Sequence, residues 1–396
     1  MKKSLIFCAA LFACAFAFQS CDKVDNPTGE PLEPTKTVID NGTELADAVK
    51  NFAKEGVLEV PANVVELYVS ENIDLSEVEV KAENLTLSVA KGVEIKIGKP
   101  MTNVSIVGDA AEPAKIIAKE GFVANNAFGL VNVKIDASAL ENSKFLISTT
   151  TSTKMAKKLD GTESTECCLF GDIELDNVEI TGLVAPLIKN TISHGVWNNI
   201  NIQNCKIEFN GNKNVFDLAR GIYENLTITN STIYSKTGHT GYFIKIDGQA
   251  SKLGYNIDNY PNNYVTTKLD HVTLYQIAKD KQMNNSNGHY KSQKYDAYVL
   301  TNSIIVYSGN ADGNTVKGWA FGGESKNPKY TWGNNTYYTD TNYKEKWENS
   351  AKQAYDDSNS ALDDDPAFKD IENADFTPTG AAQVEKQTGD QNWFKK

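Results

Sequence analysis

Arginine is almost absent from this chain of 396 residues: among 39 basic residues, only Arg220 is an arginine. The planar guanidinium that suits carboxylates and phosphates is therefore available at one place. Acidic residues number 51 and the formal net charge is −12, which argues against nucleic acid as the main partner, because phosphate binding needs a positive surface. The longest apolar run, Leu5 to Phe18, is too short for a membrane-spanning helix.

Cysteines are few, and they do not form a disulfide framework. Beyond the N-terminal segment only Cys167, Cys168 and Cys205 remain, an odd number with an adjacent pair. No zinc-binding spacing is present, so no metal site is predicted. We expect these side chains to be buried as small apolar groups, while a bridge from Cys205 to one of the pair stays open.

The N-terminus carries an export signal. Lys2 precedes the apolar run, and Ser20 supplies a small residue before Cys21, an arrangement that resembles a bacterial lipoprotein signal. The resemblance implies a signal peptide over residues 1–20 and lipidation at Cys21, with an ordinary secretory signal as the alternative. Residues 21–36 are rich in proline and charge and are expected to form a flexible tether.

Acidic residues close to the predicted anchor bear on its location. Asp22 and Asp25 resemble export tags of surface lipoproteins in some Gram-negative bacteria. This resemblance predicts an outer-membrane lipoprotein exposed at the surface. In other bacteria an aspartate after the lipidated cysteine retains the protein at the inner membrane, so the leaflet stays open.

A short repeat dominates the rest of the chain. An apolar residue, any residue, a pivot asparagine, two further residues and an apolar residue recur nine times, with histidine once at the pivot. The pivots are Asn84, Asn103, Asn132, Asn177, Asn204, Asn230, His271, Asn302 and Asn334. The alternation predicts strands, and the recurrence predicts stacked parallel coils whose pivots adopt left-handed turns and share amide hydrogen bonds.

A second strand recurs after the pivot, at residues 145–147, 216–218 and 243–246. Each coil should therefore hold at least two strands and have room for a third. An antiparallel sandwich or a propeller fits the intervals less well. The predicted fold is all-β: a single-stranded, right-handed parallel β-helix over residues 37–340, with a C-terminal capping segment over 341–396.

Helices are expected at both ends of this stack, where open strand edges need cover. Residues 43–54 place apolar side chains on one helical face, with Thr43 as the N-cap and Gly56 as the stop, and this short helix should cap the first coil. Residues 344–355 are expected to form a second helix.

These features together carry a family resemblance. A short helix, asparagine-pivoted repeats and the endings Asp365 to Phe368 and Asp375 to Thr377 resemble the pectate-lyase-like right-handed β-helix superfamily. More narrowly, the chain resembles uncharacterised bacterial surface lipoproteins that join a β-helix to a C-terminal domain of unknown function ending in Gly-Asp-x-x-Trp, here Gly389 to Trp393. Relatives in the superfamily include lyases, hydrolases and non-catalytic binders, so the resemblance implies a fold and not a reaction.

Candidate binding residues gather after two neighbouring pivots. Lys245 and Asp247 should share the outward face of one strand, and Arg220 stands at the corresponding place one coil earlier. His239 lies just before that strand. The alternative interpretation is an exposed ion-pair network that adds little to stability.

Inserted segments add aromatic and basic residues beside this cluster. Long coils place extra residues at 148–166, 249–266 and 278–297, and the second insertion carries Tyr255, Tyr260 and Tyr264. Rings that stack on sugars and lysines that meet acidic groups suit a glycan. These tyrosines could equally pack only their own loops.

The sequence therefore favours a lipid-anchored protein that binds polysaccharide through Arg220, Lys245, Asp247, His239, Tyr255 and Tyr260, as part of glycan utilisation. No cofactor is expected in that case. One alternative is a polysaccharide lyase acting on uronic-acid glycans, with Lys245 or Arg220 as the base and Ca²⁺ as a candidate helper. Another is a structural or adhesive surface protein with no glycan site. The sequence does not name the glycan or the oligomeric state.

Overall fold

The computed structural model divides the chain into two units, Met1–Val38 and Ile39–Lys396. It describes residues 38–395 except 153, 247, 249, 256–262, 286–295, 312–313, 316, 323–327 and 340–352. The predicted signal peptide, the lipidation site Cys21 and nearly all of the tether lie outside the described residues. Among the described residues, no helix combines the length and apolar character needed to cross a membrane.

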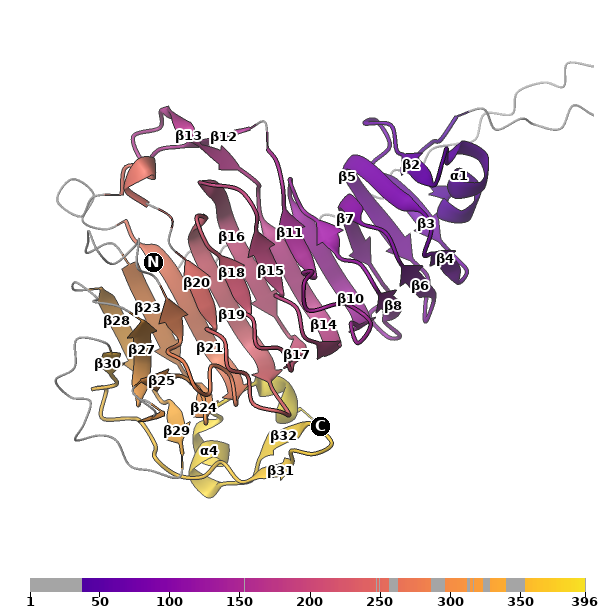
Figure 1. The fold of residues 1–396 in the computed structure, drawn as a ribbon. Helices are drawn as coiled ribbons and strands as arrows, with labels where there is room; N and C mark the ends of the chain where they lie inside the picture. The colour runs from indigo at the N-terminus through magenta and orange to yellow at the C-terminus, as the bar shows by residue number, and fades with distance from the viewer. Residues whose placement is uncertain are drawn as a thin grey trace, which may run out of the picture. The chain divides into compact units, whose positions relative to one another are not determined.

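The unit Ile39–Lys396 is all-β, as predicted, and most of its strands pair in parallel (Figure 1). The pairings fall into three series, in each of which a strand pairs with the strand one turn of chain later. The first series runs through β2 (Val57–Glu59), the start of β5 (Glu79–Val89), the start of β7 (Met101–Val107), β9 (Phe122–Val123), β11 (Ile147–Thr149), β15 (Ile188–Asn190), β18 (Phe216–Leu218), β20 (Ile244–Ile246), β22 (Asn284–Asn285) and β27 (Gly318–Gly322).

The other two series share several long strands that bend from one into the other. The second runs through β1 (Thr43–Glu44), β3 (Glu66–Val69), β5, β7, β10 (Phe128–Asp136), β14 (Ile173–Leu183), β16 (Gly195–Gln203), β19 (Ile222–Tyr234), β21 (Val265–Tyr275), β23 (Asp296–Thr301) and β28 (Lys329–Gly333). The third runs through β4 (Ile73–Leu75), β6 (Glu94–Ile97), β8 (Ala114–Ala118), β10, β14, β17 (Lys206–Phe209), β19, β21, β24 (Ile304–Val306) and β29 (Thr336–Tyr338).

Antiparallel pairs are few among the described residues, and only one of them, β27 with β30, includes a strand of these series. They join β12 (Met155–Lys157) to β13 (Glu163–Leu169), β25 (Asn310–Ala311) to β26 (Asn314–Thr315), β27 to β30 (Gln353–Tyr355), and β31 (Phe368–Asp370) to β32 (Asp375–Pro378). The strand β30 stands at the end of a segment for which we expected a helix. That prediction is wrong for its last residues, and the rest lies outside the described part of the chain.

The pivot residues adopt the predicted left-handed backbone, at φ between 46° and 56°, at eight of nine positions; Asn84 is the exception. Strand register places seven of them, from Asn132 to Asn334, opposite one another at the corner between the second and third series. Asn103 and Asn84 lie instead at the corner between the first and second series. The nine pivots therefore occupy two corners and not one column.

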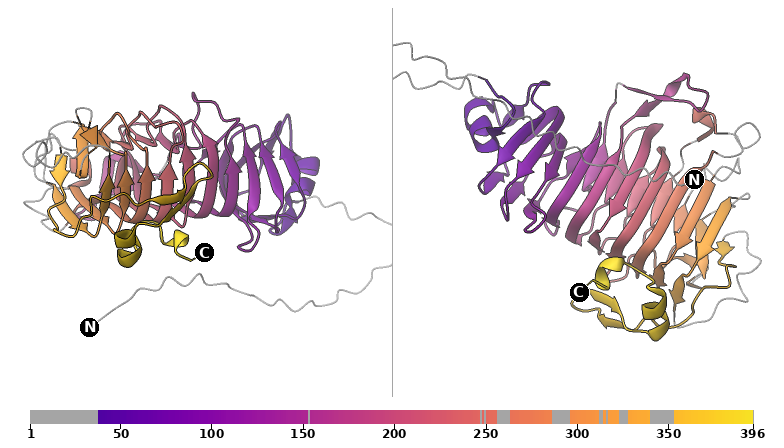
Figure 2. Two further views of the ribbon diagram at one scale, coloured as in Figure 1. Left: turned by 90° about the horizontal axis from the view of Figure 1, so that it is seen from below. Right: turned by 180° about the vertical axis from the view of Figure 1, so that it is seen from behind.

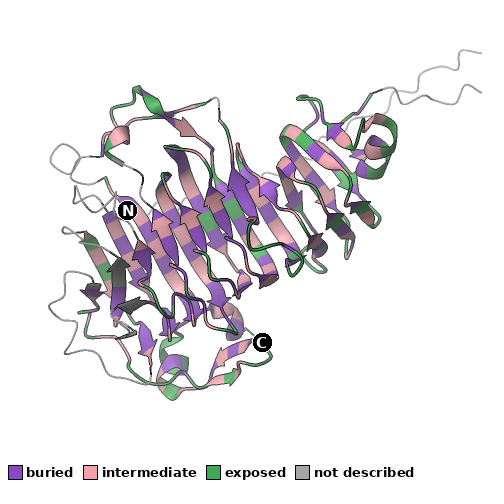
Figure 3. Ribbon diagram, in the orientation of Figure 1, coloured by how far each residue is buried: buried purple, intermediate pink, exposed green. Residues whose placement is uncertain are grey.

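Amide hydrogen bonds link several of these stacked pivots. Asn177 Nδ2 donates to Asn132 Oδ1 over 2.8 Å, and Asn334 Nδ2 donates to Asn302 Oδ1 over 3.3 Å. Figure 3 shows buried residues alternating with less buried ones along many of the strands. The buried ones are mostly aliphatic and aromatic, and they form the main core. Burying this apolar surface is the main stabilising contribution to the stack.

The helix α1 (Leu45–Phe52) lies near the start of the stack and buries Leu45 and Ala48 in the main core. The helix is present as expected, but Thr43 is not its N-cap. Thr43 belongs to β1, and the position before the helix is Glu44, whose side chain makes no capping hydrogen bond. A capping role for α1 stays a prediction.

The C-terminal residues form a small compact segment with the short helices α4 (Ala381–Lys386) and η2 (Gln391–Trp393) and the strands β31 and β32. This segment packs against the outer side of the third series, as two views show (Figures 1 and 2). A separate apolar cluster, including Tyr234, Tyr275, Phe376 and Trp393, fills this contact. The described part of the expected C-terminal cap thus covers the side of the stack over several coils.

Candidate functional site

A pocket of about 430 Å³ lies where inserted segments meet the second series. Its lining comes from β19, β21, β23 and β28 and from the insertions. The lining residues are Leu159, Glu224, Tyr255, Asn263, Tyr264, Thr266, Ala297, Val299, Lys329 and Thr331. Its volume falls in the range of small-molecule sites. We call this the insertion pocket.

Two insertions meet beside this pocket because both leave the stack between the first and second series. The earlier one forms the β12–β13 hairpin after β11, and the later one forms η1 (Ala250–Leu253) after β20. The Leu159 amide donates to the Leu253 carbonyl over 2.9 Å. Lys252 Nζ lies 2.8 Å from a carboxylate oxygen of Glu166. Contacts between segments far apart in the sequence thus join the two insertions, which contribute Leu159 and Tyr255 to the pocket lining.

Glu224 supplies the carboxyl group of the insertion pocket. It lies near the start of β19 and is half-buried. Burial raises the pKa of this carboxyl group, and the nearby charge of Asp172 raises it further. A carboxyl group in this state retains a proton to higher pH than an exposed one, so it can donate as well as accept hydrogen bonds.

Two tyrosines and a lysine complete the polar side of the pocket. Tyr255 is only 5% exposed, and burial together with the charge of Glu224 raises the pKa of its phenol. Lys329 Nζ lies 5.4 Å from the centroid of the Tyr264 ring, a cation–π contact. Aromatic faces, one cation, one carboxyl group and the Thr266 hydroxyl are therefore gathered in a single concave site.

Of the sequence-predicted contacts, Tyr255 lies in this pocket, while Lys245 and Arg220 do not line it. Lys245 is in β20, and register places it opposite Asp217 of β18 and not opposite Arg220. Arg220 lies in the turn after β18, exposed and in a left-handed conformation at φ 66°. Arg220 nevertheless lies between β18 of the first series and β19 of the second, at the same corner of the stack from which both insertions leave.

His239 is buried too deeply to contact a glycan, which is the role predicted from the sequence. Its side chain is fully buried, packs edge-on against Phe209, and accepts a hydrogen bond from the Ala278 amide at Nδ1 over 3.0 Å. Nε2 therefore carries the proton and donates to the Lys213 carbonyl over 2.7 Å. Burial lowers the pKa of this imidazole to about 4. A surface glycan cannot reach this ring, which instead ties three segments of the stack together.

The two remaining predicted contacts, Asp247 and Tyr260, lie outside the described residues. The described cysteines are free thiols, so none of Cys167, Cys168 and Cys205 forms a bridge. Burial raises the pKa of the Cys205 thiol to about 12, consistent with the expected role as a buried small side chain. Within the described ranges, no cluster of three or more His, Cys, Asp or Glu residues could hold a metal ion.

The motif Gly389 to Trp393 makes structural contacts that sequence reasoning did not assign. Asp390 Oδ2 accepts a hydrogen bond from Thr232 Oγ1 over 2.8 Å, and Trp393 Nε1 donates to the same hydroxyl over 2.8 Å. The Gly389 amide donates to the carbonyl of the pivot Asn302 over 2.7 Å. Burial raises the pKa of Asp390. The motif therefore fastens the C-terminal segment to the stack.

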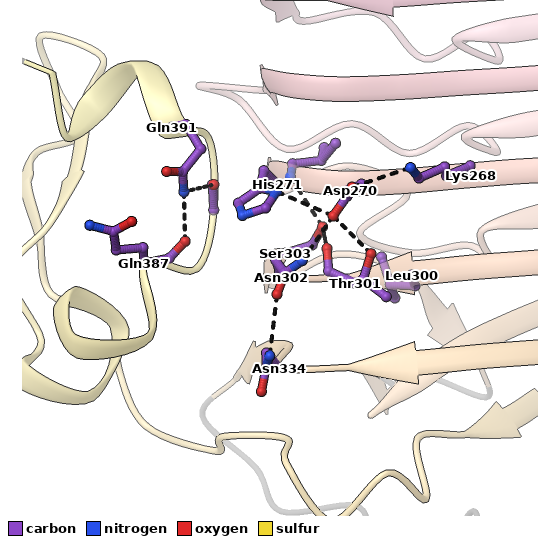
Figure 4. Close-up of polar contacts among 12 residues, drawn as sticks. Lys268, Asp270, His271, Leu300, Thr301, Asn302, Ser303, Asn334, Gln387 and Gln391 are labelled. Carbon is purple, nitrogen blue, oxygen red and sulfur yellow. Dashed lines mark hydrogen bonds and ion pairs between the residues drawn. The ribbon is translucent and has the colours of Figure 1, made fainter. Parts of the chain in front are cut away.

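A polar cluster borders this junction (Figure 4). Asp270 Oδ1 accepts hydrogen bonds from Asn302 Nδ2 over 2.9 Å and from Thr301 Oγ1 over 2.8 Å, and Lys268 Nζ lies 3.2 Å from Asp270 Oδ2. Burial opposes ionisation of Asp270, but these partners outweigh it and lower the pKa. The neighbours of this carboxylate thus satisfy its hydrogen-bonding capacity and stabilise the corner at which Asn302 lies.

No curated protein matches this chain. One segment of the chain, residues 267–393, begins inside β21. It contains both the motif Gly389 to Trp393 and part of the strand stack to which that motif is fastened. This segment matches the family described as "Domain of unknown function (DUF5123)".

Proposed function

We propose that this protein is a lipid-anchored cell-envelope protein whose three strand series form a right-handed parallel β-helix of the pectate-lyase-like kind, and that it binds polysaccharide. Its place is the outer membrane of a Gram-negative bacterium, facing outward, where it takes part in glycan utilisation. The location is supported by the export signal and the tether that the sequence predicts. Parallel pairing with the strand one turn later supports the β-helix.

The observation that carries the binding proposal is the composition of the insertion pocket. Sugars present apolar ring faces and many hydroxyl groups, so their sites combine aromatic rings with a few polar groups. Tyr255 and Tyr264 supply the rings, and Glu224, Lys329 and Thr266 supply hydrogen-bond partners. Rigid parallel strands hold the floor of the pocket, which reduces the entropy lost on binding.

Binding is tested by affinity electrophoresis through gels that contain single plant or host polysaccharides, neutral and acidic. The parent protein is expected to be retarded by at least one of them. The variant with Tyr264→Ala and Lys329→Ala should lose that retardation, while Lys115→Ala, an exposed lysine on β8, should keep it. Retardation by no polysaccharide would leave the structural or adhesive role as the better account.

A polysaccharide lyase is the second candidate, favoured by the pairing of Glu224 with Tyr255. A protonated carboxyl group can hydrogen-bond the substrate carboxylate and stabilise the developing charge, while the neutral phenol of Tyr255 can donate a proton to the leaving oxygen. A separate group would then act as the base that removes the proton from the sugar. Incubation with polyuronates, with and without Ca²⁺, should then raise the ultraviolet absorbance of unsaturated uronate. No rise under either condition rejects this candidate and leaves the binding proposal unaffected.

A further inference from the structure

A row of mostly polar residues crosses the second series, partly along the lining of the insertion pocket, and continues past it. Asn225 Nδ2 donates to Asn199 Oδ1 over 3.1 Å, and Asn199 Nδ2 donates to Asp172 Oδ1 over 3.2 Å. In the other direction, register places Asn225 opposite Thr266, Thr266 opposite Ala297, and Ala297 opposite Lys329. A polymer lying along this row would meet one strand after another from β14 to β28.

The insertion pocket uses only part of that row. Its lining includes Glu224 of β19 and residues of every later strand of the series up to β28, but no residue of β14 or β16. Leu159 and Tyr255 also line the pocket, and the hairpin that carries Leu159 joins the series at β16 through Cys168. These two residues belong to the β12–β13 hairpin and to the residues that follow η1.

The hairpin and η1 together form an arch on this side of the pocket. The arch is closed by the hydrogen bond from Leu159 to Leu253 and by the ion pair of Lys252 with Glu166. Figure 1 shows β12 and β13 standing beyond the ends of the neighbouring strands, on the side where η1 lies. Leu159 packs against the main core, and Leu253 is buried within it, so the arch is anchored to the stack.

We infer that the insertion pocket receives the end of a glycan chain and not an internal stretch. This inference rests on the proposed polysaccharide binding. A chain that enters across β28, past Lys329 and Thr331, meets the arch at Leu159 and Tyr255. Its terminal sugar therefore lies beside Glu224, and the row from Asn225 to Asp172 takes no part in binding.

Oligosaccharides of defined length distinguish the two binding modes. The probes are cello-, xylo-, malto- and galacturono-oligosaccharides from the trisaccharide to the decasaccharide, with calorimetry as the readout. In the series that binds, the dissociation constant should stay nearly constant with length. Blocking one chain end, by reduction of the reducing sugar or by methylation of the terminal hydroxyl, should weaken binding about tenfold or more, because buried polar partners lose their contacts.

Other outcomes separate this inference from the proposal beneath it. Affinity that rises steadily with chain length, together with equal binding of both end-blocked forms, overturns end recognition but keeps glycan binding. Binding of none of the four series, together with no retardation by any polysaccharide gel, removes both.

A shortened hairpin gives an independent test of the arch. Replacing residues 156–165 by a Gly-Ser pair removes Leu159 but retains the pairing of Cys168 and Leu169 with β16. End-blocked oligosaccharides should bind this variant, and its affinity should rise with chain length. Lys157→Ala is the matched control, since it changes an exposed lysine of the same hairpin and keeps both contacts that close the arch, and it should retain end selectivity. Unchanged end selectivity in a folded shortened variant would contradict the role of the arch.

Discussion

The left-handed pivot asparagines allow a test of the stack itself, and Asn177 is the best position for it. Its φ is 53°, and its side-chain amide donates to Asn132 Oδ1 of the preceding coil over 2.8 Å. Asn177→Ala removes the hydrogen bond and places a residue with no local polar compensation in the left-handed region. Asn177→Gly removes the same hydrogen bond but accepts that backbone conformation freely.

The expected losses of stability follow from the lost hydrogen bond and from the cost of the left-handed backbone conformation. The exposed hydrogen bond from the Asn177 side-chain amide to Asn132 contributes about 0.5 kcal/mol, at the low end for neutral hydrogen bonds. The left-handed conformation costs alanine about 1–2 kcal/mol, whereas glycine loses about 0.5–1 kcal/mol through the greater freedom of its unfolded chain. We expect Asn177→Ala to lower the free energy of unfolding by about 2 kcal/mol and to be about 1 kcal/mol less stable than Asn177→Gly.

Amide hydrogen exchange, measured on peptides from β10 and β14, is the appropriate assay. Stacked repeats open locally, so a single global unfolding midpoint would average over the site. Exchange in the alanine variant should be about fivefold faster than in the glycine variant, which corresponds to about 1 kcal/mol. Asn142→Ala is the control, because its amide also donates to a side chain, Asn212 Oδ1, but its φ is not positive.

Equal exchange in the alanine and glycine variants would refute this reasoning. It would mean that the backbone conformation at the pivot makes no measurable contribution to stability. Asparagine would then recur at the pivots only because of its amide contacts. Acceleration in Asn142→Ala as large as in Asn177→Ala would contradict it as well, since that control changes no left-handed residue.

Three further predictions concern the buried polar groups and the C-terminal segment. The folded state lowers the pKa of His239 from 6.5 to about 4, so the free energy of unfolding should fall as the pH drops from 6.5 toward 4, by up to about 3 kcal/mol. Urea denaturation midpoints measured against pH check this, and the His239→Gln variant should show a correspondingly smaller fall. A Cβ at Gly389 would lie 2.8 Å from Ile304 Cδ1 at a φ of 91°, so Gly389→Ala should release the C-terminal segment to limited proteolysis, whereas Gly161→Ala, with open space around its Cβ, should not. Cys205 should react with thiol reagents only after unfolding, and reaction in the native protein would contradict its burial.

The strand stack was readable from the sequence because its repeat is local. An apolar position three residues after each pivot fixes which side faces the core, and asparagine reports the left-handed turn. The same local pattern cannot distinguish one corner of a coil from another. Asn103 and Asn132 fit it equally well, yet they lie at different corners. The residues of β10 before Asn132 pair with β7, and those after Asn132 pair with β8, so the neighbour of Asn132 in the preceding coil lies between β7 and β8 and is not Asn103.

Contacts between distant segments could not be read in this way. Thr232 and Asp390 are 158 positions apart, so no periodicity relates them, and the side-on packing of the C-terminal segment was not predicted. His239 was included among the predicted binding residues because it lies just before the strand that carries Lys245. The buried Phe209 ring and the two backbone partners that hold it inside belong to other coils.

The candidate site illustrates how local and distant information combine. The sequence located the insertions and their tyrosines, but not that both insertions leave the stack between the same two series and therefore meet. Once they meet, Tyr255 is buried beside Glu224, a residue with no signal of its own in the sequence. Lys329 comes from β28, three pairings along the series from the strand that carries Glu224. In a stack of parallel strands, residues a coil apart in sequence become neighbours. A site on such a protein is therefore set by which coils carry insertions at a common corner rather than by any motif along the chain.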